Sequence, residues 1–99
     1  MKIDFSQPIK NFDGTPAQYQ EKVLTLATVC ALSLNSSKPS DAMESVQRGN
    51  LAMTLFKGGV IDITPEDCSS CRSILHEAWA PAIVAQAYKM LDPDTVRES

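Results

Sequence analysis

The stretch VLTLATVCALSL, residues 23–34, decides the fold, because nine of its twelve residues are apolar. A membrane-spanning helix needs about 20 consecutive apolar residues, so this shorter run predicts a helix buried inside a protein. Apolar residues surround that helix on nearly every side, and its neighbours must therefore cover several of its faces. We predict that it is the central helix of the core. Its expected start is Thr15-Pro16, which with Gln18 forms a capping signal, and its expected end is Leu34.

Capping and stop signals downstream predict three more helices. Ser40 or Asp41 caps the second, which ends before Gly58-Gly59; within it, Gly49 is suited to a close helix crossing or a kink. Thr64, followed by a proline, caps the third, and Pro81 separates that helix from a fourth over residues 82–91. In the last two helices we expect these side chains to face the core: Cys68, Cys71, Leu75, Ala78, Trp79, Ile83, Val84, Ala87, Tyr88 and Leu91.

Short β segments complete the predicted fold. Residues 2–5 (KIDF) alternate polar and apolar side chains, as a half-buried strand does, and residues 60–63 (VIDI) repeat the pattern. Pairing between these two segments explains both. We therefore predict one mainly α domain over residues 1–99, a compact four-helix domain with a minor two-stranded β element. It consists of a β-arm (1–14), a helical core (15–92) and a frayed tail (93–99).

Composition and charge exclude several classes of protein. The chain has 99 residues, and its 12 acidic and 9 basic residues give a net charge of −3. The basic residues are dispersed from Lys2 to Arg97, whereas a nucleic-acid binder normally presents a basic face. Met1–Ser6 contains no apolar run, so we expect no signal peptide. Three cysteines cannot form a complete set of intramolecular disulfides, and together these features predict a cytoplasmic protein with no membrane and no nucleic-acid partner.

Cys68 and Cys71 form a Cys-x2-Cys motif with two chemical interpretations. The first is thiol redox chemistry near the start of a helix, although Glu66 and Asp67 beside it disfavour a thiolate. The second is a zinc site, because Cys68, Cys71 and His76 match the first three ligands of a zinc knuckle. Pro81 occupies the position of the fourth ligand, so Cys30 would have to supply it. The alternative to both is that the cysteines are small apolar core residues.

No group of residues designates a catalytic site. His76 is the only histidine, and a catalytic base needs a nucleophile and an orienting partner that the sequence does not identify. Gly58-Gly59 lacks the lysine and hydroxyl residue of a phosphate-binding loop. We therefore predict a protein that is not an enzyme and that needs no cofactor.

Two sets of residues carry a resemblance to a known group of proteins. At the start these are K-I-D-F and P-I-x-x-x-D-G, and later I-T-P-E-D and A-W-A-P-A-I-V-A-Q-A-Y-K-M-L-D. The chain resembles a group of small proteins of about this length encoded in tailed-phage and prophage genomes, most strongly over residues 60–92. That group has no established activity or catalytic residues, so the resemblance implies none. The opening arm is also similar to small acidic tail-assembly chaperones of phages.

These observations favour a phage or prophage accessory protein that acts in the bacterial cytoplasm by binding another protein, either in virion assembly or on a host factor. The alternative is a thiol-redox or zinc-binding protein that uses Cys68 and Cys71. The second helix carries apolar residues on two faces: Met43, Val46 and Met53 on one, and Leu51 and Leu55 on the other. Either both faces are core, or one binds a partner or a second copy of the chain, with Met43 and Met53 at its edge. Trp79 is either core or a partner anchor, since tryptophan is enriched at binding hot spots.

Overall fold

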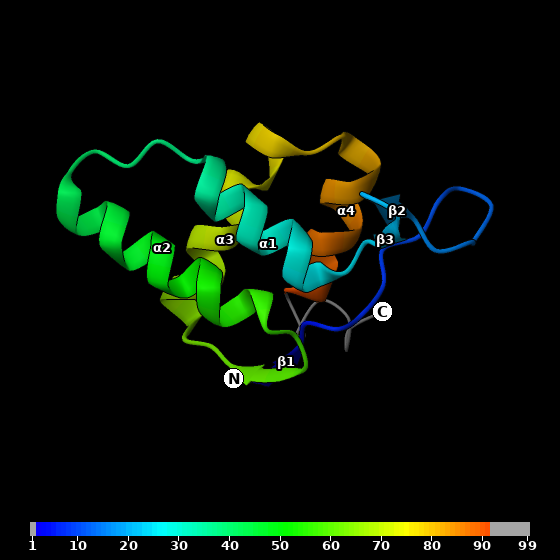
Figure 1. Ribbon diagram of the computed structural model, residues 1–99, viewed down its shortest axis with the longest axis horizontal. Coiled ribbons are helices and arrows are strands. Elements are labelled where there is room, and N and C mark those ends of the chain that lie inside the picture. The colour runs from blue at the N-terminus through cyan, green and yellow to red at the C-terminus, as the bar shows by residue number, and fades with distance from the viewer. Residues whose placement is uncertain (1, 92–99) are drawn as a thin grey trace.

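A central apolar helix organises the fold of the protein. The structure is a computed structural model, and it describes residues 2–91. Helix α1 (Leu26–Ser36) packs against α2 (Ala42–Phe56), α3 (Pro65–Ala78) and α4 (Pro81–Met90), and Figure 1 shows it between α2 on one side and α4 on the other. Seven of its eleven residues are buried. The predicted central helix and the mainly α, four-helix architecture are confirmed.

The N-terminal arm completes the first turn of α1. Thr25 is the N-cap, and its hydroxyl accepts a hydrogen bond from the Thr28 amide. The amides of Leu26 and Ala27 donate to the carbonyl oxygens of Gln7 and Phe5, over 2.9 and 2.8 Å. Since the first amides of any helix lack partners within it, the arm supplies acceptors that a buried first turn cannot obtain from water.

The predicted helix start at Thr15 is wrong. Residues 18–23 form a hairpin of two short strands, β2 (Gln18–Tyr19) and β3 (Lys22–Val23), and α1 begins only at Leu26. The physical reason is pairing between distant segments: the Ala17 amide donates to the Ile9 carbonyl, and the Leu24 amide donates to the Ala17 carbonyl, each over 2.8 Å. These bonds use backbone groups that a helix would need, so the capping signal at Thr15 is overridden.

The predicted pairing of the two KIDF-like segments is confirmed. Strand β1 (Lys2–Asp4) pairs antiparallel with β4 (Val60–Asp62), with Ile3 opposite Ile61. The two strands lie together at one edge of the helical body (Figure 1). The β2–β3 hairpin is a second small sheet that the sequence did not predict.

The ends of the other helices follow their sequence signals. Asp41 caps α2 and Thr64 caps α3, each through a side-chain oxygen that accepts from an amide three residues on. Pro81 separates α3 from α4 as predicted, and α4 starts at Pro81 itself, one residue before its predicted start. The predicted tail, residues 93–99, lies outside the described residues.

Two predicted core residues are exposed. Ala78 is exposed because α3 ends there, and the ring of the next residue, Trp79, reaches α1 instead. Tyr88 is also exposed, and the Arg72 guanidinium lies 4.1 Å from the centre of its ring. Cys68, Cys71, Leu75, Ala87 and Leu91 are buried as predicted, whereas Trp79, Ile83 and Val84 are partly buried and pack against the core.

The tight turn between β2 and β3 predicts a stabilising substitution. Gln20 and Glu21 have φ angles of 51° and 68°, a left-handed conformation that costs most residues roughly 1–2 kcal/mol and that Asn-Gly adopts readily. Allowing for the greater chain entropy of glycine when unfolded, we expect Gln20→Asn with Glu21→Gly to raise the free energy of unfolding by about 1 kcal/mol. Urea denaturation measures this, and an unchanged or lower value contradicts the turn.

Candidate functional site

The three cysteines are buried inside the core and not at its surface. Cys30 lies on α1, and Cys68 and Cys71 lie on α3, where the Cys68 thiol donates to the Leu91 carbonyl over 2.8 Å. The pKa of Cys30 is raised above its usual value, first by its hydrogen bond with Cys71, then by burial and by the neighbouring thiols. Reactive cysteines are partly exposed and have lowered pKa values, so this environment favours packing over redox chemistry.

His76 is kept apart from the three neighbouring cysteines of the alternative zinc site in the described structure. His76 lies exposed in the last turn of α3, whereas Cys68 and Cys71 are buried. Within residues 2–91, no three histidine, cysteine or acidic side chains are arranged to hold a metal ion. The knuckle spacing instead falls on a regular helix, which keeps its histidine and its cysteines in different surroundings.

The buried Cys30 thiol predicts a loss of stability at alkaline pH. In the unfolded chain a thiol releases its proton above about pH 8.5, whereas the raised pKa keeps Cys30 protonated in the folded chain. The stability contribution is therefore complete below that pH and decreases above it, by about 1.4 kcal/mol per pH unit for such a thiol. We expect the free energy of unfolding to fall more steeply between pH 9 and 10.5 in the wild type than in Cys30→Ala. Equal pH dependence of the free energy of unfolding in the two proteins contradicts the raised pKa of Cys30.

Trp79 joins α3 to α1 across the core. Its indole nitrogen donates to the Val29 carbonyl at 3.1 Å and to the Ser33 hydroxyl at 3.0 Å. Ser33 is the buried polar residue of the core, and its hydroxyl in turn donates to Val29. Tyr19 of the β2–β3 hairpin meets the Trp79 ring edge to face, with centroids 5.7 Å apart. The indole therefore has an internal role, in line with the core interpretation of Trp79.

This junction predicts that Trp79→Phe destabilises the fold. The substitution removes the hydrogen bonds to Val29 and Ser33, and a typical intramolecular hydrogen bond stabilises a fold by about 0.5–1.5 kcal/mol. Urea denaturation of the variant measures the loss. Tyr88→Phe, which keeps an exposed ring on α4, is the matched control and is expected to change the free energy of unfolding by less than about 0.5 kcal/mol. Equal effects of the two variants contradict the role of Trp79.

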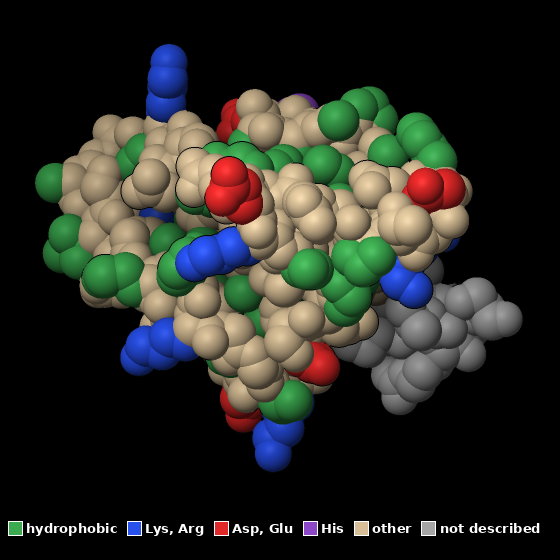
Figure 2. Space-filling model, turned by 45° about the vertical axis from the view of Figure 1, so that its right-hand side comes forward, with side chains coloured by type: hydrophobic (Ala, Val, Ile, Leu, Met, Phe, Trp, Pro, Cys, Tyr) green, Lys and Arg blue, Asp and Glu red, His purple; other side chains and the backbone are tan. Residues whose placement is uncertain are grey.

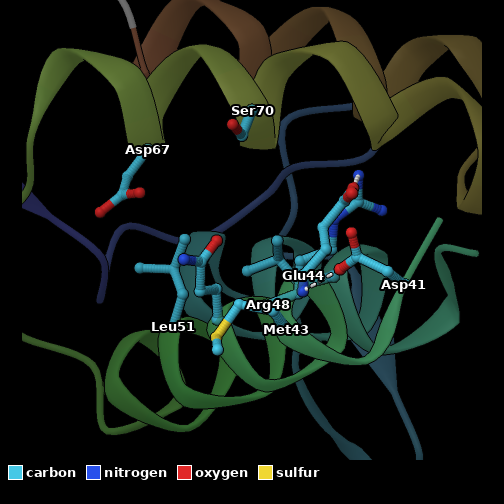
Figure 3. Close-up of a pocket in the computed structure, with 9 residues that line it drawn as sticks. Asp41, Met43, Glu44, Arg48, Leu51, Asp67 and Ser70 are labelled. Atoms are coloured by element: carbon cyan, nitrogen blue, oxygen red, sulfur yellow. Dashed lines mark hydrogen bonds and ion pairs between the residues drawn. The ribbon is translucent and has the colours of Figure 1, made fainter. Parts of the chain in front are cut away.

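A polar cavity of about 400 Å³ lies between the N-terminal halves of α2 and α3. Figure 3 shows Asp41, Glu44 and Arg48 gathered on α2, with Asp67 and Ser70 on α3 across the opening. The Asp41 carboxylate accepts from the Glu44 amide, and the Glu44 carboxylate pairs with Arg48. These groups cap and stabilise the first turns of α2. They do not place a nucleophile beside a base.

One face of α2 is apolar and exposed. Only Ala52 and Leu55 of its fifteen residues are buried, and these two pack against α1. The interpretation in which both faces are core is therefore wrong for the single chain. The exposed side chains, with their accessible fractions, are Met43 (68%), Val46 (57%), Met53 (65%) and Phe56 (61%); we call them the α2 face.

An apolar groove runs beside the α2 face, between α2 and α1. Its volume is about 410 Å³, and it shares Met53 and Phe56 with the face. Its other lining residues are Ala31, Leu32, Asn35, Gly49 and Ala52. The face and the groove therefore adjoin along α2, with α1 forming the other wall of the groove. The apolar pattern of the second helix predicted three of the four residues of the face, Met43, Val46 and Met53, and it gave Phe56 no binding role.

The surface elsewhere carries dispersed charge. On the side of the molecule seen in Figure 2, lysine, arginine and acidic side chains are scattered and form no basic patch. Within the described residues, no helix is long and apolar enough to cross a membrane.

Comparisons with known proteins assign no family to the chain. No protein-family model matches it, and no match was found among curated proteins or among solved structures.

Proposed function

We propose that the protein is a non-enzymatic accessory protein of a phage or prophage, and that it acts in the bacterial cytoplasm by binding a protein through the α2 face. The exposure of Met43, Val46, Met53 and Phe56 on one side of α2 carries this proposal. The resemblance to small phage-encoded proteins supports its source, and a role in virion assembly or on a host factor is consistent with it.

The chemistry of the α2 face suits protein binding. Soluble monomers rarely expose large apolar patches, and where such a patch is exposed it marks an interaction site. The two methionines have flexible, polarizable side chains that adapt to a partner surface, and Phe56 contributes an aromatic ring of the kind enriched at interfaces. The adjacent groove between α1 and α2 adds a concave part that receives a partner side chain.

The alternative, thiol or zinc chemistry at Cys68 and Cys71, has less support. Both thiols are buried, and Cys68 donates to a backbone carbonyl. His76 lies apart from them on the surface. A zinc site would also require stoichiometric metal in protein purified without chelator, which is a direct check on the choice.

The proposal predicts that Met43→Glu with Met53→Glu abolishes partner binding and leaves the fold intact. Both side chains are about two-thirds exposed, so charge there disrupts a docking surface while changing the free energy of unfolding by less than about 0.5 kcal/mol. The measurement is affinity capture, by tagged protein, from phage-infected or lysogenic cells, with helical circular dichroism and cooperative melting recorded alongside. We expect the wild type to capture a defined protein and the variant to lose it.

Phe12→Glu is the matched control for this experiment. Phe12 is 99% exposed at the tip of the loop that joins Asn11 to Thr15, and this loop projects from the end of the molecule opposite α2 (Figure 1). We expect its replacement to preserve capture. A variant that keeps the partner despite charge at both methionines contradicts the proposal, as does loss of folding, which would make these residues core.

A further inference from the structure

Gly49 lies in the middle of α2, and nothing inside the chain requires a glycine there. A glycine in a helix interior costs roughly 1 kcal/mol relative to alanine. A Cβ atom built on Gly49 would meet no atom within 4 Å, and Gly49 is not among the glycines with positive φ. Neither crowding nor backbone conformation in the monomer therefore requires glycine here. The close approach of another chain is a physical reason that would account for it.

The α2 face is also symmetric about this glycine. Two α2 helices can pair antiparallel so that position 49 of each copy lies at the level of position 50 of the other. In the same register Val46 lies at the level of Met53, and Met43 at the level of Phe56. Every exposed apolar residue of the face thus finds an apolar residue of the second copy at its level, as a two-fold axis requires.

Charge favours the same orientation. The N-terminal end of α2 is acidic, with Asp41 and Glu44, and its C-terminal end carries Lys57. Antiparallel pairing places Lys57 of each copy near the acidic end of the other, and it also opposes the two helix dipoles. Asn50, exposed on the same side of the helix, lies beside Asn50 of the second copy, where two amides can bond and fix the register.

From these observations we infer that the partner of the α2 face is a second copy of the chain, bound through an antiparallel α2–α2 contact with its two-fold axis at Gly49 and Asn50. This inference rests on the proposed function, because it names the protein that the face binds. Val46 and Met43 of the second copy lie along the apolar groove lined by Gly49, Met53 and Phe56. Helix α2 is only about 22 Å long at 1.5 Å per residue, so the contact is smaller than a standard interface, and we expect a weak, reversible dimer.

Sedimentation equilibrium of the purified protein from 1 µM to 1 mM tests the inference. We expect a reversible monomer–dimer equilibrium. Gly49→Leu keeps the face apolar and favours the helix, yet it inserts two side chains where the helices approach, so we expect its dissociation constant to rise at least tenfold. Met53→Glu is expected to do the same by charge. Ser69→Leu, on the exposed side of α3, is the matched control and is expected to leave the constant unchanged.

Cysteine cross-linking tests the orientation. The native thiols are buried, so the wild type is expected to give no linked dimer under mild oxidation. The two cysteines of the Asn50→Cys variant lie side by side at the two-fold axis and are expected to form a disulfide between the copies. Met43 of one copy lies at the level of Phe56 of the other, thirteen residues from the second Met43. The two Met43→Cys side chains are therefore about 20 Å apart along the helix and are expected not to link. Parallel pairing would place each Met43→Cys beside its own counterpart, so linkage of both variants overturns the inference.

Each failure of the dimer can be separated from failure of the proposed function. A wild type that stays monomeric at 1 mM, a Gly49→Leu variant that dimerises normally, or assembly beyond the dimer overturns the α2–α2 contact. If capture from cells is then still lost on replacing Met43 and Met53, the protein-binding function stands with a different partner. If capture does not depend on those residues either, both proposals fail.

Discussion

The buried first turn of α1 is the constraint on which the rest of the structure depends. Leu26 and Ala27 are shielded from water, so their amides must find acceptors within the protein. The carbonyl oxygens of Gln7 and Phe5 provide them, and a buried amide left unpaired would cost about 1–3 kcal/mol. The arm is therefore part of the core, and Phe5, whose carbonyl accepts one of these bonds, is itself buried.

This constraint also determines how α2 is placed. The arm covers the start of α1, while α3 and α4 cover other sides of it (Figure 1). Helix α2 packs against α1 with Ala52 and Leu55 buried and Leu51 partly buried against the core, while Met43, Val46, Met53 and Phe56 face outward. A helix with eight apolar residues and two buried ones retains apolar surface that the monomer does not use, and binding is the physical consequence we draw from it.

The sequence predicts those parts of the fold that local signals govern. Asp41, Thr64 and Pro81 mark the helix starts because capping and proline geometry act within one turn of the chain, and the strand at residues 60–62 has a matching partner at 2–4. The hairpin at residues 18–23 was missed because nothing local indicates it: Gln20 and Glu21 are poor residues for a left-handed turn. Its cause is the backbone pairing of Ala17 with Ile9 and Leu24, which only the folded chain brings together.

The candidate site divides in the same way. Sequence periodicity shows that α2 has two apolar faces, but the choice between them depends on which one α1 covers, and the spacing of 43, 46 and 53 is equally good for core or contact. The interpretation of Gly49 changes once the structure is known. In the sequence it fits a kink or a crossing; in the structure it lies in a continuous helix with open space at its Cβ position. A residue that weakens its own helix and relieves no contact within the chain is what we expect where a second helix is to pack closely against the first.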